Sequence, residues 1–311
     1  MGWMSLIGAI GLFFAVLYGI YFMAFRRNKT TILDDRTLPQ GEQYEPYNEG
    51  IRKAIEKMLP VPYEELAVTS YDGLNLYGKY YQLAEQAPLI LFFHGYRSSS
   101  IRDGNGIFEL CSKYGYNILM VDQRAHGKSE GKMISFGIRE RYDVLSWINH
   151  VTNHMGPEIP IVLAGISMGA ATVLMASNLN LPDNVKGIMA DCSYSSPKAI
   201  LRSVMKSLKL PDRIFYPLAK WSARIYGGLD IEETSAREAV AESKVPILFI
   251  HGDDDRFVPC SMSQECYDAC ASEKKLVFVK SAGHGISYCV DGKLYEKEVQ
   301  EFTRKVLGKY Y

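Results

Sequence analysis

Short apolar runs alternate with amphipathic segments along most of the chain, from about residue 66 to the C-terminus. Apolar runs of four or five residues between turn-forming residues are typical of buried strands, whereas longer periodic segments are typical of helices. The strands are expected as an opening hairpin at residues 66–70 and 74–81, then at 89–93, 117–121, 161–164, 187–190, 247–250 and 276–279. This alternation predicts a mostly parallel eight-stranded sheet flanked by helices.

Two intervals depart from the alternation. Residues 192–245 are too long for a simple crossover and contain helical pieces at 197–208 and 217–226, so we expect a small helical cap inserted over the sheet edge. Residues 30–65 are polar, with a short helical candidate at 47–58, and are interpreted as a tether and lead-in. The main domain is therefore placed at residues 66–311.

The N-terminal segment predicts a membrane anchor at residues 1–29. No charged residue occurs from Trp3 to Phe25, and Arg26, Arg27 and Lys29 follow at once. About 23 helical residues extend about 35 Å, enough to cross a hydrocarbon core of about 30 Å. A secretory signal peptide would carry its positive charge before a shorter apolar stretch. We expect an uncleaved single-pass helix with the main domain in the cytoplasm, since basic residues favour that side.

A row of small residues, Gly11, Ala15 and Gly19, recurs at four-residue spacing in this segment. Such rows can form a pairing face between membrane helices, which leaves weak self-association open.

Composition excludes several function classes. The 311 residues are 47% hydrophobic and 23% charged with a formal net charge of zero, which is ordinary for a globular domain and gives no basic excess for nucleic acid. Neither a phosphate-binding G-x-x-x-x-G-K-[ST] loop nor a G-x-G-x-x-G fingerprint occurs. The six cysteines show no C-x-x-C or zinc-type spacing and are interpreted as reduced. No cofactor or metal is expected.

The candidate nucleophile is Ser167, in Gly165-Ile166-Ser167-Met168-Gly169. An apolar run precedes this pentapeptide and an Ala- and Leu-rich helical segment follows it. Strand, tight turn and helix in that order are the context in which G-x-S-x-G marks an exposed nucleophilic serine. A helix N-terminus beside it would favour a developing oxyanion.

A serine hydroxyl needs a neighbouring base, and that base needs a carboxylate to orient it. His284 lies in a glycine-rich loop directly after the last predicted strand, which makes it the candidate base. Asp255, in the segment 251–259, is the preferred acid. Asp254 is a local rival because one residue of loop slack could exchange the two, and Asp191 at the end of an earlier strand is a further alternative.

From about residue 66 onward the chain resembles the α/β-hydrolase-fold serine hydrolases, in particular bacterial esterase and lipase-like members and catalytic domains of the prolyl-oligopeptidase type. The motif His94-Gly95-Tyr96 matches the oxyanion loop of that family. The resemblance implies that the backbone amides of Tyr96 and Met168 bind the oxyanion. The segment 122–131 resembles the D-x-R-x-H-G-x-S-x-G loop and is interpreted as structural, with Ser129 and His126 as a second reactive pair left as an alternative.

These features together predict a membrane-tethered serine hydrolase that cleaves acyl esters, including lipid-like ones, through a Ser167–His284–Asp255 triad and an acyl-enzyme. A peptidase or amidase and an acyltransferase are alternatives on the same fold. A non-catalytic binding module is the alternative of a different class.

Overall fold

The computed structural model describes residues 2–27 and 35–308, with side chains from Ser5 onward. Its strands form one sheet in the order β1-β2-β4-β3-β5-β6-β7-β8. β1 and β2 are antiparallel neighbours joined at Asp72-Gly73, β2 is antiparallel to β4, and the other pairs are parallel. The strands are β1 (Glu64–Thr69), β2 (Asn75–Tyr81), β3 (Leu89–Phe93), β4 (Asn117–Val121), β5 (Ile161–Ile166), β6 (Val185–Asp191), β7 (Ile247–Gly252) and β8 (Lys274–Val279).

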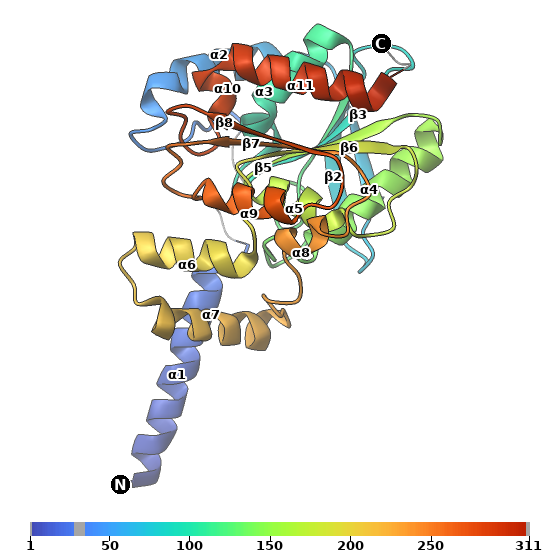
Figure 1. The fold of residues 1–311 in the computed structure, drawn as a ribbon. Coiled ribbons are helices and arrows are strands. Elements are labelled where there is room, and N and C mark those ends of the chain that lie inside the picture. The colour runs from blue at the N-terminus through green and yellow to red at the C-terminus, as the bar shows by residue number, and fades with distance from the viewer. Residues whose placement is uncertain (1, 28–34, 309–311) are drawn as a thin grey trace.

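Helices cover both faces of the sheet, as Figure 1 shows, because the central strands are apolar on both sides. On β3, Leu89 and Leu91 pack toward α4 and α5, while Ile90 packs toward α2, α3 and α11. The helices are α1 (Gly2–Ala24), η2 (Glu45–Tyr47), α2 (Asn48–Met58), α3 (Ser100–Tyr114), α4 (Glu140–Met155), α5 (Met168–Ala176), α6 (Pro197–Ser207), α7 (Asp212–Gly227), α8 (Ala236–Val240), α9 (Ser261–Ala269), α10 (Ser287–Val290) and α11 (Gly292–Leu307).

The predicted fold class is confirmed, and the strands lie where the apolar runs indicated. The helix after β3, α3, begins at Ser100. Ser99 caps it by accepting a hydrogen bond from the Arg102 amide at 3.2 Å. Gly104 lets α3 pack closely on the sheet, because a Cβ there would lie 2.0 Å from the end of the Met120 side chain, which would have to move.

Three helices occupy the interval between β6 and β7. α7 begins at Asp212, five residues before the predicted start, and runs through Pro217 instead of beginning there. α6 and α7 project together from the body of the molecule, whereas α8 packs against α5 and α9 in the layer beside the sheet (Figure 1).

α1 leaves the domain across α7 in Figure 1, with the N-terminus at the far end. Its segment Ser5–Ala24 is long and apolar enough to cross a membrane. The C-terminal half of α1 packs against the rest of the protein. Leu17 and Tyr21 are buried there, as is Phe25 directly after the helix. Lys29, part of the basic flank in the sequence, lies outside the described residues.

The lead-in is partly built into the domain. Ile51, Ile55 and Met58 form the buried side of α2 and pack in the same cluster as α3 and α11. Residues 28–34, at the start of the expected tether, lie outside the described part.

Replacement of Gly169 by Ala tests the contact that fixes α5 beneath β3. A Cβ on Gly169 would lie 2.0 Å from the Phe93 carbonyl oxygen, a backbone atom that cannot rotate away. We expect Gly169→Ala to lower the free energy of unfolding by about 3 kcal/mol, the upper end for overpacking. Denaturant titration of the detergent-solubilised full chain measures this change.

Gly50→Ala is the matched control. Gly50 lies in α2 with nothing within 4 Å of the added Cβ, so its replacement should stabilise the protein by up to about 1 kcal/mol. Equal effects of the two substitutions would contradict the close approach at Gly169.

Candidate active site

Ser167 stands on a sharp turn between β5 and α5. Its φ of 54° and ψ of −116° lie in a region that non-glycine residues rarely adopt. Both flanking glycines are required, since a Cβ on Gly165 would lie 2.4 Å from the Gly169 carbonyl carbon and one on Gly169 would meet β3. The Ser167 amide donates to the Asp191 carbonyl at 2.8 Å, which ties the turn to β6. The serine is thereby held at the carboxyl edge of the sheet.

A chain of hydrogen bonds joins the three candidate residues. Ser167 Oγ lies 2.9 Å from His284 Nε2, and His284 Nδ1 lies 2.6 Å from Asp255 Oδ2. The contact with Asp255 favours the tautomer protonated at Nδ1, because a carboxylate only accepts. Nε2 is then free to accept the serine proton. The turn after β5 and the loops after β7 and β8 bring together residues up to 117 positions apart.

Asp255 is buried, and both of its carboxylate oxygens have hydrogen-bond partners. Its Oδ1 accepts from the amides of Phe257 and Val258 at 2.9 and 2.8 Å, and its Oδ2 lies 3.2 Å from His251 Nε2. Burial disfavours ionisation of Asp255, but the electrostatic interaction with His284 and the hydrogen bonds with both histidines outweigh it and hold the Asp255 pKa well below its usual range. Asp255 is therefore a permanent anion beneath the imidazole.

The two rival carboxylates are placed differently. Asp254 is 54% exposed at its side chain and pairs with Arg256 on the surface. Asp191 is buried behind the site and accepts from Ser287 Oγ at 3.2 Å. Burial raises the pKa of Asp191 to about 6, against a smaller opposing effect of the nearby histidines. Of the three carboxylates, Asp255 is the one within hydrogen-bond distance of His284 Nδ1.

The loop after β3 passes directly beside the serine. A Cβ on Gly95 would lie 3.4 Å from Ser167 Cβ, and Tyr96 is the residue that follows Gly95 in this loop. The Gly95 amide donates to Asp103 Oδ2 at 2.8 Å and fixes the start of the loop. Met168 begins α5 on the other side of the serine. Tyr96 and Ser167 line the same cavity, and the role of the Tyr96 and Met168 amides as oxyanion donors stays a prediction.

A buried polar network connects this loop to α5. His94 Nε2 accepts from the Gln123 amide at 3.1 Å, and Gln123 Oε1 accepts from Thr172 Oγ1 at 3.2 Å. Burial lowers the pKa of His94, so the ring is neutral and acts through its hydrogen bonds. The network sets the distance between the two walls of the site.

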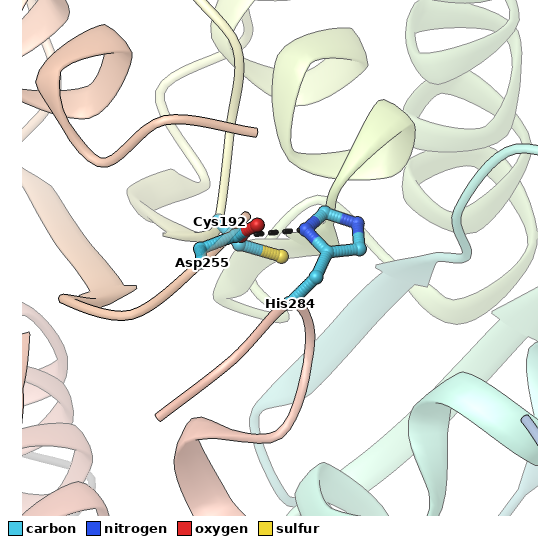
Figure 2. Close-up of side chains that lie close together, drawn as sticks. All are labelled: Cys192, Asp255 and His284. Atoms are coloured by element: carbon cyan, nitrogen blue, oxygen red, sulfur yellow. Dashed lines mark hydrogen bonds and ion pairs between the residues drawn. The ribbon is translucent and has the colours of Figure 1, made fainter. Parts of the chain in front are cut away.

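Cys192 is a neighbour of the site that the sequence did not indicate. Figure 2 shows its sulfur beside Asp255 and His284, and one ligand-type atom of each residue lies within 4.8 Å of the others. Burial raises the pKa of the Cys192 thiol well above its ordinary value, and Asp255 and His284 are bonded to each other. A protonated thiol is a poor metal ligand, so the group is better suited to hydrogen bonding.

A cavity of about 370 Å³ opens over Ser167 and His284. Its lining includes Gln43 and Tyr44 from the lead-in, a contribution that the sequence interpretation missed. Gln43 Oε1 accepts from the His284 amide at 3.2 Å. The segment expected to be a plain tether therefore forms part of the wall around the candidate base.

Comparisons with known proteins agree with this architecture. A family model described as "alpha/beta hydrolase fold" matches residues 88–241. The uncharacterised protein YqkD of Bacillus subtilis is 29% identical over 249 residues, covering 77% of this chain and 80% of its own. The Pyrococcus furiosus esterase Pf2001 superposes with a TM-score of 0.65 at 24% identity, covering 81% of this chain and 94% of the esterase.

These matches support membership of the α/β-hydrolase superfamily. The lysophosphatidylserine lipase ABHD12 of Danio rerio is a further relative, 28% identical over 200 residues, which cover 61% of this chain and 49% of that protein. Membership and the esterase and lipase relatives support hydrolase activity.

Side chains of the loop that resembles D-x-R-x-H-G-x-S-x-G make structural contacts with the rest of the domain. Arg124 is buried between Asp72 and Asp143, with N–O distances of 2.9 and 2.6 Å. Ser129 Oγ donates to the Asp122 carbonyl at 2.5 Å and accepts from the Tyr77 amide at 2.8 Å. These bonds join the loop to β2 and occupy the Ser129 hydroxyl.

Ser129→Ala tests that structural interpretation. The substitution leaves the Tyr77 amide without its acceptor, so the free energy of unfolding should fall by about 1–3 kcal/mol while the Ser167 site is unchanged. Thermal unfolding measures the first effect, and labelling of Ser167 by a fluorophosphonate measures the second.

Ser177→Ala is the matched control, because the Ser177 hydroxyl is buried with no hydrogen-bond partner among the described residues. Its removal should be neutral or stabilising. Loss of Ser167 labelling in folded Ser129→Ala would instead support a reactive role for Ser129.

Proposed function

We propose that the chain is a membrane-tethered serine hydrolase that cleaves acyl esters. The observation that carries the proposal is the hydrogen-bonded chain from Ser167 through His284 to Asp255, with contacts of 2.9 and 2.6 Å. A hydroxyl, a neutral imidazole and a buried anion in that order are the groups that nucleophilic acyl transfer requires.

In the proposed reaction Ser167 Oγ attacks the acyl carbonyl while His284 Nε2 takes the hydroxyl proton. The Tyr96 and Met168 amides stabilise the oxyanion of the tetrahedral intermediate. His284 returns the proton to the leaving alcohol as the bond to the acyl carbon breaks. Water then attacks the acyl-enzyme while His284 accepts its proton. As the bond between Ser167 Oγ and the acyl carbon breaks, His284 returns that proton to Oγ, and the acid and free Ser167 are released. Asp255 stabilises the imidazolium in both halves and does not take up the proton.

The lining of the cavity favours an acyl substrate with an apolar part. Ile107, Phe257 and Tyr288 contribute apolar surface to the cavity that Ser167 and His284 line. The names of the relatives, an esterase and a lysophosphatidylserine lipase, point in the same direction. A peptide bond remains a second candidate, because an acylaminoacyl peptidase of Pyrococcus horikoshii superposes with a TM-score of 0.60, covering 82% of this chain and 44% of the peptidase at 21% identity.

We assign α1 as the tether. Its segment Ser5–Ala24 has a mean hydropathy of 2.2, and the basic residues follow on the domain side. The domain is therefore expected to face the cytoplasm. A tag fused to the C-terminus should resist an external protease in intact cells and be cleaved after permeabilisation; cleavage in intact cells would reverse the orientation.

Labelling of the purified full chain with a fluorophosphonate tests the activated serine. The probe should modify Ser167, identified by mass spectrometry, and His284→Ala should abolish the modification, because the serine loses its base. A folded protein that is not labelled at Ser167 would contradict the proposal. Turnover of ester, thioester and amide substrates then separates an esterase from an amidase.

Asp255→Asn and Asp254→Asn form a matched pair in the same assay. Asn at 255 cannot stabilise the imidazolium or hold the required tautomer, so kcat should fall about 10⁴-fold. Asn at 254 changes only a surface pair with Arg256 and should leave kcat unaltered. The opposite result would transfer the role of the acid to Asp254.

A further inference from the structure

The helical hairpin α6–α7 carries an exposed apolar surface. Ile214, Trp221 and Ile225 are spaced by seven and four residues, which places them on one side of α7. They are 60%, 53% and 50% exposed, and Leu208 in the turn before α7 is 63% exposed. Large apolar side chains gathered on one surface mark a contact with a partner or a membrane.

The helix α1 lies directly against this hairpin. Ser222 Oγ donates to the Leu17 carbonyl at 2.8 Å, and the Tyr226 hydroxyl donates to the Phe14 carbonyl at 2.9 Å. The Trp221 ring packs edge to face on Phe13, with centroids 6.0 Å apart. The exposed surface of α7 is thus continuous with the apolar surface of α1.

The position of these contacts along α1 fixes the depth of α7. They involve residues from Phe13 to Tyr21, which lie about 5 to 17 Å from the Ala24 end at 1.5 Å per residue. A bilayer with a hydrocarbon core of about 30 Å needs the whole segment Ser5–Ala24 to cross it. If α1 spans, α7 must therefore lie within the leaflet next to the domain.

We propose that α7 and the turn before it form a membrane-contact surface that lies in the leaflet on the domain side. The partner that this membrane-contact surface binds is an anionic bilayer. Lys206, Lys209 and Arg213 are exposed around Leu208 and Ile214, and they match the phosphates of lipid headgroups. This inference rests on the proposed tether, since α1 fixes the depth.

The surface is linked to the candidate active site. Ser203 Oγ on α6 donates to the Phe257 carbonyl at 3.3 Å, and the Phe257 ring lies 5.1 Å from the His284 ring. A bilayer held against the hairpin would thus lie close to the loop that carries the triad acid. The substrate class that fits this placement is an ester presented by the membrane.

Tryptophan quenching in vesicles tests the surface with the full chain. The sequence contains three tryptophans, and Trp147 is buried in the core. In the Trp3→Phe variant, reconstituted with phosphatidylcholine and phosphatidylglycerol, lipids brominated near the glycerol end of their chains should remove the Trp221 share of the emission. Iodide in the water should not remove it. The additional change Trp221→Phe should leave an emission that neither quencher affects.

The tether is measured separately in the Trp221→Phe variant, where brominated lipid should quench Trp3 at the start of α1. Quenching of Trp3 by lipid together with quenching of Trp221 by iodide alone would overturn the α7 surface and leave the tether in place. Absence of lipid quenching at both positions would overturn both.

Discussion

The close approach of the first turn of α5 to the end of β3 is the constraint on which the site depends. Gly169 lies against the carbonyls of Phe93 and His94, and no residue with a Cβ fits there without displacing backbone. That contact places the serine turn and the oxyanion loop side by side. The polar network from His94 through Gln123 to Thr172 then holds the two walls at a fixed separation. The geometry around Ser167 therefore depends directly on the packing of α5 against β3.

Most of the fold could be predicted because strand and helix periodicities are local. Apolar runs located the strands, and glycines around Ser167 and His284 indicated two functional turns. The sequence did not predict contacts between residues that are far apart along the chain. Gly104 of α3 packs against Met120 of β4, and only the packed structure shows that contact. The choice between Asp255 and Asp254 also needed coordinates, since adjacent residues in one loop point to opposite environments.

The contribution of the lead-in lay beyond sequence reasoning for the same reason. Gln43 contacts the backbone of His284 across 241 positions of chain, and its polar surroundings in the sequence are typical of a linker. Tyr44 has no motif either, yet it is largely buried in the cavity, where burial and the nearby negative groups raise the pKa of its hydroxyl. Residues of the lead-in therefore form part of the cavity wall beside Ser167 and His284.

The end of α1 gives the anchor a second role. The Tyr96 hydroxyl donates to the Ala24 carbonyl at 2.9 Å, and Arg97 Nη2 donates to the Met23 carbonyl at 2.6 Å. These carbonyls belong to the last turn of the helix, where no intrahelical donor remains. The oxyanion loop and the anchor thus satisfy each other's polar groups. A chain shortened to begin after Ala24 would lose the acceptors for two loop side chains, so α1 and the loop after β3 form one structural unit rather than two interchangeable modules.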